Sequence, residues 1–344
     1  MVMQFEWTDN LSEEQIISLK QFYLSLPLVH VEQYPCWNDV DKTEAKVNYC
    51  IATYENVLKG YVAVYEYRKI EARIVFGPLS HSLDVSLQII LDVIQYYKRK
   101  GFFSLQVLLG MSVGTDATYL QYSLFKRYPF KFYLNENNKG TLLLELRNKT
   151  EDQLLKHFSN GHRYDIKKAY KNNLVCKLLQ SSDEIVEFSN GYSEMYRQRG
   201  IHYPVDKSSN NFLSIHNWIE TNKSGFFLGV FENRVMIGGA LILFRNDRAQ
   251  YYRGFSLPGN KKQPISHIAL FESMKRVMLI GIPYFDFGGY NILVSEKDQV
   301  YQINKFKKGF HGEYFFYPPT MYFDLKPMGT ALSHFLKRIK RMIV

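Results

Sequence analysis

The sequence predicts an α/β (α+β) protein with two successive domains, each combining helices with a mixed β-sheet. The chain has 344 residues, which suits two domains of ordinary size or one large one. Hydrophobic residues make up 46% of it, with 26 Tyr and 25 Phe, as in a globular protein with a substantial core. Helical segments alternate with short apolar segments, and this order occurs twice along the chain.

The first half opens with a helix at residues 11–25, for which Ser12 and Gln15 form a capping box. A turn-rich segment around Trp37 follows. The elements predicted after it are strands at 47–53, 57–66 and 70–76, a helix at 83–97, a strand at 103–108, a helix at 116–126, and strands at 130–134 and 141–146. The first domain is therefore expected to cover residues 1–146.

The second half repeats this order with a different sequence. Thr150 and Gln153 form a capping box for its first helix, and Pro264 stands at the first position of a later one. Its other predicted elements are helices at 161–171 and 183–199 and strands at 175–179, 225–231, 235–244, 249–255 and 284–287. The second domain is expected to cover 147–317. Because Pro318-Pro319 interrupts the chain, we expect residues 318–344 to pack back onto the first domain.

Composition limits the class of protein and its location. The three cysteines are scattered, and the nine histidines show no metal-ligand spacing, so the sequence predicts no metal site. No signal peptide and no apolar run of about 20 residues is present. Phosphate-loop and dinucleotide fingerprints are absent too, so no bound cofactor is expected. These features favour a cytoplasmic protein that at most attaches to the inner face of the membrane.

Positive charge is concentrated in two places. The net charge is +10, and residues 147–171 and 326–344 both carry a basic excess. Such an excess suits a phosphate-bearing, nucleic-acid or anionic-membrane partner. The segment 328–344 has an apolar stripe opposite its basic residues, which is typical of a helix docked on the protein or of one lying on an anionic membrane.

The stretch Pro283–Phe310 organises the second half. A short apolar strand ends in Gly288-Gly289, a polar loop runs from Tyr290 to Gln299, and a basic segment with interleaved aromatic residues follows. The glycines would let the backbone approach a ligand closely. An ordinary loop before a solvated basic helix end would give the same pattern. Asp286 is interpreted as a turn-capping residue, with a general base as the alternative.

Three segments of the second half resemble the FemABX family, the peptidoglycan bridge-forming aminoacyl transferases. They are YFDFGGYN…INKFKKGFHGEY at 284–314, FSNGHRYDIKKAYKNNLVCKLL at 158–179 and MYRQRGIHYP at 195–204. The resemblance covers most of 150–323. It implies two tandem GNAT-like (acyl-CoA N-acyltransferase-like) domains, and two similar mixed α/β halves fit that fold.

The resemblance also assigns catalytic residues. Phe306 and Lys307 match the aromatic-Lys position of the family, so Lys307 is predicted to stabilise the negative charge that develops during acyl transfer. Lys305 and Lys308 are the alternatives for this role. Gly288, Gly289, Tyr290 and Lys305 are predicted to contact substrate.

Further residues are predicted to bind phosphate. Arg163, Lys167 and Lys171 lie at helical spacing and form a phosphate clamp or a solvated face. Arg199 matches a family arginine that holds the acceptor's diphosphate, and we expect Arg163, Arg199 and the 288–310 loop to line a cleft shared by the domains. The family's lysine after an N-terminal tryptophan is displaced here, since Trp37 is followed only distantly by Lys42 in an acidic segment.

The leading hypothesis is an acyltransferase that moves an aminoacyl group from aminoacyl-tRNA to an amine of a cell-wall precursor. The precursor is expected to be phosphate-bearing or lipid-linked. A CoA-dependent N-acyltransferase in surface polysaccharide or lipid synthesis is one alternative, although residues 254–259 (GFSLPG) lack a Gly-x-Gly core. A non-catalytic protein that only binds such precursors is the other.

Overall fold

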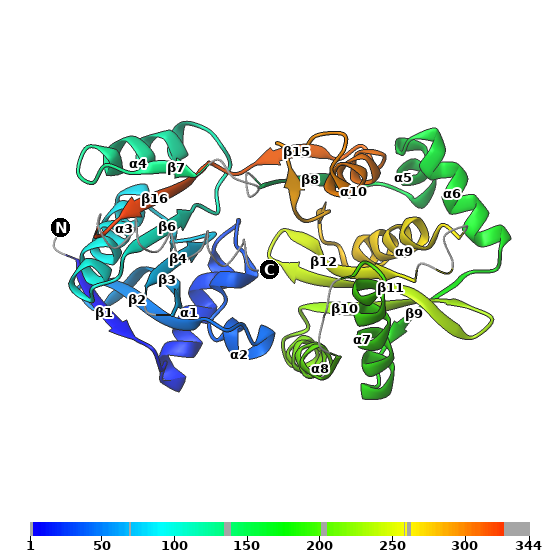
Figure 1. Ribbon diagram of the computed structural model, residues 1–344, viewed down its shortest axis with the longest axis horizontal. Helices are drawn as coiled ribbons and strands as arrows, with labels where there is room; N and C mark the ends of the chain where they lie inside the picture. The colour runs from blue at the N-terminus through cyan, green and yellow to red at the C-terminus, as the bar shows by residue number, and fades with distance from the viewer. Residues whose placement is uncertain are drawn as a thin grey trace. The chain divides into compact units, whose positions relative to one another are not determined.

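The computed structural model of the chain describes residues 3–68, 70–133, 139–200, 205–257, 259 and 263–326. These residues form two compact units, shown in Figure 1. The second unit runs from Lys139 to Phe315, and the described residues before and after it form the first. Each unit contains one eight-stranded mixed sheet within the described residues. The predicted α/β class with mixed sheets is therefore confirmed.

The sheet of the first unit is antiparallel apart from one pair. Its order is β1 (Gln4–Thr8), β2 (Lys46–Tyr54), β3 (Val57–Tyr67), β4 (Glu71–Val75), β6 (Ser104–Leu108), β16 (Thr320–Asp324), β7 (Lys131–Tyr133), with β5 (Leu79–Ser80) paired to β3. Strands β4 and β6 are parallel. Glu55 and Asn56 both have positive φ and close the β2–β3 hairpin.

Four helices of the first unit are α1 (Glu13–Ser25), α2 (Trp37–Asp41), α3 (Leu83–Arg99) and α4 (Thr115–Phe125), and η1 (Val31–Gln33) is a 3₁₀ turn. The capping box of Ser12 and Gln15 is confirmed. Ile89, Ile90 and Val93 of α3 are completely buried in the core. Burial of such a side chain contributes about 1.5–3 kcal/mol, so the apolar stripe of α3 is a main source of stability in this unit.

The sheet of the second unit has the order β14 (Tyr290–Asn291), β8 (Lys139–Glu145), β13 (Tyr284–Asp286), β12 (Arg248–Ser256), β11 (Val235–Arg245), β10 (Gly225–Glu232), β9 (Val175–Leu179), with β15 (Glu313–Phe316) paired to β8. Its helices are α5 (Glu151–His157), α6 (Asn160–Lys171), α7 (Ser182–Arg197), α8 (Val205–Asn222), α9 (Ile265–Ile280) and α10 (Gln299–Lys308). Strands β12 and β13 are parallel.

Helices cover both faces of this second sheet. Successive residues of a strand face opposite sides. On β11, a side chain at Gly238 would meet Ile265 of α9, whereas one at Gly239 would meet Phe188 of α7. Figure 1 likewise shows α7 and α9 on opposite sides of β11.

Several elements differ from the sequence predictions. The strand predicted at 141–146 ends the first half in the sequence, but β8 pairs with β13 and β14 in the second sheet. Strand pairing depends on distant partners, and a short apolar segment does not encode which sheet it joins. Strand β1 and helix α8 were not predicted. Pro264 caps α9 from outside, one residue before the predicted position.

The segment after Pro318 enters the first sheet as β16, between β6 and β7. The amphipathic stretch predicted at 328–344 lies outside the described residues. Across the part of the chain that the structure describes, no helix has both the length and the apolar character needed to cross a membrane.

Candidate active site

A cavity of about 670 Å³ lies in the second unit where β12 and β13 separate. The two strands are paired only as far as Gln250 and Asp286, after which β12 continues to Ser256 and the other chain turns away at Gly288. The cavity is lined by residues 251–256 of β12, residues 287–289 after β13, the end of α7 and one face of α10. Its volume falls within the range of about 300–1,000 Å³ that is usual for small-molecule sites.

The turn after β13 requires a glycine at position 288. Gly288 has φ +69°, and a Cβ atom there would lie 2.8 Å from the carbonyl oxygen of Tyr251. Asp286 fixes this turn, because its Oδ1 accepts hydrogen bonds from the Gly288 N–H at 2.8 Å and from the Thr141 hydroxyl. The interpretation of Asp286 as a turn-capping residue is confirmed.

Lys307 of α10 is buried against this turn. Its side chain is 7% exposed, and its Nζ donates to the carbonyl oxygens of Gly288 at 3.2 Å and Gly289 at 2.6 Å. Burial lowers the pKa of Lys307 to about 8, and the nearby Asp286 carboxylate partly opposes this shift. Lys307 is therefore mostly an ammonium ion at neutral pH.

An ammonium group has three N–H donors. Two of those of Lys307 serve the Gly288 and Gly289 carbonyls, and no described residue accepts the third. Because Lys307 lines the cavity, this third N–H is available to a bound molecule. The charge is held in place before any ligand binds, which is the arrangement that favours electrostatic stabilisation of a transition state.

Asp286 supplies the balancing negative charge. It is 1% exposed, and its Oδ2 lies 3.8 Å from a guanidinium nitrogen of buried Arg248. A buried charge is tolerated when it is paired and hydrogen-bonded. Arg248 is also paired with Asp247, at 3.0 Å, so two carboxylates offset the charges of Arg248 and Lys307 around the turn.

Helix α10 is positioned by two histidines that the sequence analysis did not single out. His162 of α6 interacts through Nε2 with the Phe306 carbonyl oxygen at 2.7 Å, and its ring lies edge-on to that of His267 of α9. Burial lowers the pKa of both, that of His267 to about 4. Both are therefore neutral at pH 7, and the Nε2–H of His162 is the donor. His162 lies at helical spacing from buried Ile166 and Ala169, a signal that the sequence did contain.

Phe306 lies beside Lys307 in the cavity wall, as the aromatic-Lys match implies. Its ring packs on His162, His267 and Phe310 at centroid distances of 5.4, 4.9 and 5.4 Å. The ring therefore ties α10 to the core and leaves one side toward the cavity. Its assignment as a catalytic residue stays a prediction.

Arg199 lines the same cavity as Lys307. It follows the end of α7 and is exposed, so its guanidinium is free to meet a charged ligand. Tyr251 lies beside it in the wall, and burial raises the pKa of Tyr251 to about 12. The structure thus brings together two cations that lie more than one hundred positions apart in the sequence.

The basic face of α6 does not reach this cavity. Arg163 is half-buried and donates to Asn160, Lys167 is exposed, and neither is part of the lining. Tyr170 of the same helix is exposed, and its hydroxyl donates to Glu272. The phosphate clamp of this helix stays a prediction.

The remaining predicted residues divide between the units. Trp37 is 2% exposed in the first unit, and Lys42, with φ +37°, follows α2 there with an exposed side chain. Tyr290 and Lys305 line a second cavity, on the other side of α10 from Lys307. Of the three lysines considered for oxyanion stabilisation, only Lys307 lines the larger cavity.

No protein-family model and no curated protein matches the sequence. Solved structures, however, match the fold. The crystal structure of FemX superposes with a TM-score of 0.77 at 14% identity, over 95% of this chain and 99% of that one. The chain has a FemX-like fold. The FemABX resemblance is therefore confirmed at the level of the fold.

Two further structures share the FemX-like fold. A tandem GNAT protein from the clavulanic acid biosynthesis pathway gives a TM-score of 0.61 at 9% identity, over 95% of this chain and 99% of that one. A C-terminal domain assigned to a lysylphosphatidylglycerol synthetase of Agrobacterium fabrum gives 0.59 at 7% identity, over 92% and 93%. The predicted tandem GNAT-like architecture is confirmed, and at these identities the likeness concerns the fold alone.

Proposed function

We propose that this protein is an aminoacyl transferase that acylates an amine of a phosphate-bearing cell-wall precursor, with aminoacyl-tRNA as the donor. The observation that carries the proposal is the buried Lys307 ammonium, which has one N–H directed to no described acceptor and shares its cavity with Arg199. The FemX-like fold supports this assignment.

The chemistry follows from the placement of Lys307. The acceptor nitrogen attacks the ester carbonyl carbon of the donor, a C–N bond forms, and the C–O bond to the tRNA ribose breaks. The amine loses a proton and the released ribose oxygen gains one. Between these steps the carbonyl oxygen carries negative charge, and the fixed Lys307 ammonium stabilises it. An activated ester needs little assistance from a general base, so Asp286 can serve as a turn-capping residue alone.

Arg199 is proposed to hold the acceptor. Its exposed guanidinium suits a phosphate or diphosphate, because the planar fork of arginine donates two parallel hydrogen bonds to such a group. The aromatic side chains of Tyr192, Tyr196 and Tyr252 line the same cavity and offer apolar surface to the rest of the acceptor. Aminoacyl-tRNA is a cytoplasmic compound, so the reaction is placed in the cytoplasm, with lipid-linked acceptors reached at the membrane face.

An acyl-CoA donor is the second candidate. The likeness to a tandem GNAT protein, in a structure without AcCoA, favours an acyl-CoA donor. FemX gives the higher TM-score over a similar share of the chain, so aminoacyl-tRNA is the donor proposed first.

The test is a donor panel. The protein is incubated with charged tRNAs and, separately, with acyl-CoAs, in the presence of candidate amine acceptors, and the products are measured by mass spectrometry. Lys307→Met is the matched control for background transfer. Transfer only from charged tRNA supports the proposal, and transfer only from acyl-CoA replaces it with the second candidate. Precursor binding without transfer from any donor contradicts both and leaves a binding protein.

A further inference from the structure

A second cavity, of about 220 Å³, lies on the other side of α10 from Lys307. Tyr301, Asn304, Lys305 and Lys308 follow one another at helical spacing and form its helical wall. Ile303, Phe306 and Lys307 face the larger cavity instead. The backbone from Gly288 to Val294 passes from one cavity to the other, so a single loop borders both.

Asn304 marks this second cavity as a polar site. Its side chain is 4% exposed, and its Nδ2 donates to the Asn291 carbonyl oxygen at 2.6 Å. Its Oδ1 is buried and accepts no hydrogen bond from the described residues. A buried acceptor without a donor is unfavourable, so a hydroxyl or N–H group of a bound molecule would be stabilising here.

The charge of the cavity is positive. Lys305 and Lys308 are both exposed, and no carboxylate is part of the lining. Lys308 Nζ lies 6.0 Å from the ring centroid of Tyr290 and 5.8 Å from that of Tyr314, and hydrogen bonds to both hydroxyls raise the pKa of Lys308. Of the nearby acidic side chains, Asp298 accepts from Ser295, and Glu296 accepts from the hydroxyl of Tyr301 in the cavity wall without being part of the lining.

We infer that this cavity binds a ribose phosphate of the acyl donor. Two ammonium groups match a phosphate, and a ribose hydroxyl would donate to Asn304 Oδ1. The volume is too small for a whole substrate but suits such a fragment. The inference rests on the proposed function, because it places the donor's phosphate beside the loop that holds Lys307. Aminoacyl-tRNA and acyl-CoA both carry a ribose phosphate.

The inference is tested by binding, independently of turnover. AMP is titrated into the protein, with adenosine as the probe that lacks phosphate. The double variant Lys305→Met, Lys308→Met is expected to weaken AMP binding at least about tenfold, because two charge-assisted contacts are lost. Lys297→Met is the matched control, since Lys297 is exposed on the same loop and lines neither cavity. Equal AMP affinity in the double variant and the wild type would overturn the inference, as would equal affinity of the wild type for AMP and adenosine.

A third variant examines the amide. Asn304→Asp places a carboxylate at the buried position and is expected to weaken AMP binding more than adenosine binding, with folding checked by circular dichroism. An unchanged AMP affinity in a folded Asn304→Asp protein counts against the site.

Competition identifies the source of the ribose phosphate. Displacement of AMP by uncharged tRNA supports an aminoacyl donor, and displacement by CoA supports an acyl-CoA donor. Displacement by neither overturns the assignment to an acyl donor. If no donor reacts in the panel but AMP binding is lost in the double variant, the proposed function fails and the phosphate cavity stands. If transfer proceeds and AMP affinity is equal in the two proteins, the cavity inference fails alone.

Discussion

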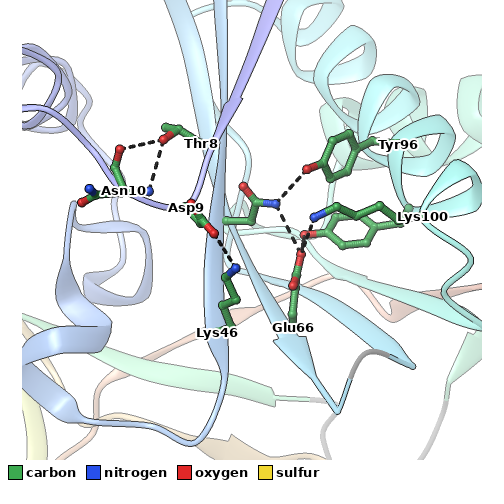
Figure 2. Close-up of polar contacts among 9 residues, drawn as sticks. Thr8, Asp9, Asn10, Lys46, Glu66, Tyr96 and Lys100 are labelled. Carbon is green, nitrogen blue, oxygen red and sulfur yellow. Dashed lines mark hydrogen bonds and ion pairs between the residues drawn. The ribbon is translucent and has the colours of Figure 1, made fainter.

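Glu66 in the first unit and Lys307 in the second are both buried charged side chains, and their charges are satisfied in opposite ways. In the first unit, Glu66 of β3 is 8% exposed and accepts from the Tyr97 hydroxyl at 2.8 Å, from Asn48 at 3.3 Å and from Lys100 at 3.5 Å. Figure 2 shows Lys100 reaching Glu66 from α3. In the second unit, the two partners of Lys307 are backbone carbonyls of a turn.

The difference distinguishes a structural charge, Glu66, from the candidate functional charge, Lys307. Glu66 has side-chain partners on regular elements and lines neither of the two cavities of the second unit, so nothing in its surroundings points to a ligand. Lys307 lines a cavity, and one of its three N–H groups has no acceptor among the described residues. Burial alone therefore does not indicate a catalytic group, whereas burial at a cavity wall with incomplete hydrogen bonding makes Lys307 a candidate for one.

The largest expected effect is on Lys307. Lys307→Met should lower kcat on the order of a hundredfold or more, because the ammonium acts mainly when the oxyanion forms. Acceptor affinity should stay within a few-fold of the wild type. Both quantities are measured, kcat by product formation and affinity by calorimetry. Normal turnover in Lys307→Met, with Lys305→Met or Lys308→Met inactive, would assign the role to the other face of α10.

The comparison predicts a different outcome for Glu66. Glu66→Ala leaves the buried Tyr97 hydroxyl without its acceptor, and we expect the free energy of unfolding to fall by about 3 kcal/mol. Glu66→Gln keeps an acceptor oxygen and should lose less. Urea denaturation gives both values. Activity per folded molecule should be unchanged in Glu66→Gln, and a large drop in its kcat would remove the distinction between the two charges.

A smaller effect is expected from pH. Since burial lowers the pKa of Lys307 to about 8, the ammonium is lost as the pH rises through that value. If the charged form is active, kcat should fall above pH 8, to roughly a tenth by pH 9. Arginine does not deprotonate in this range, so Lys307→Arg should lack this decline even at reduced activity. A wild-type kcat that rises through pH 8 would indicate that Lys307 acts as a base.

Much of the fold was accessible from local sequence signals. Capping boxes begin helices at Ser12, Thr150 and Ser181 in the described part of the chain, and those at Ser12 and Thr150 were predicted. Helix α8 was missed because its first part is polar, although Phe212, Ile215 and Ile219 lie at helical spacing and are buried. The sheet membership of β8 follows from pairing with residues about 140 positions away, which no local pattern specifies.

Site residues that belong to a sequence motif could be predicted, whereas those brought together only by tertiary packing could not. The FKKGF run predicted Lys307, yet Lys305, Lys307 and Lys308 are equivalent in the sequence. Which of them is buried depends on the face that α10 presents to the core. His162 and His267 come together from different helices around Phe306. The basic row on α6 was predicted as a phosphate clamp, whereas the arginines that line the larger cavity are Arg199, which follows a helix end, and Arg253 of β12.

Arg199 gives the smallest expected effect and the sharpest test of acceptor binding. Because its guanidinium is exposed at the cavity, solvent weakens its interaction with a phosphate, and Arg199→Ala should raise the acceptor KM about tenfold with kcat nearly unchanged. An acceptor analogue without phosphate should show no difference between the two proteins. Arg163→Ala is the matched control, since Arg163 carries the same charge outside the lining. A larger rise in KM for Arg163→Ala than for Arg199→Ala would return the acceptor's phosphate to the basic face of α6 and leave Arg199 a solvent-exposed side chain at the cavity.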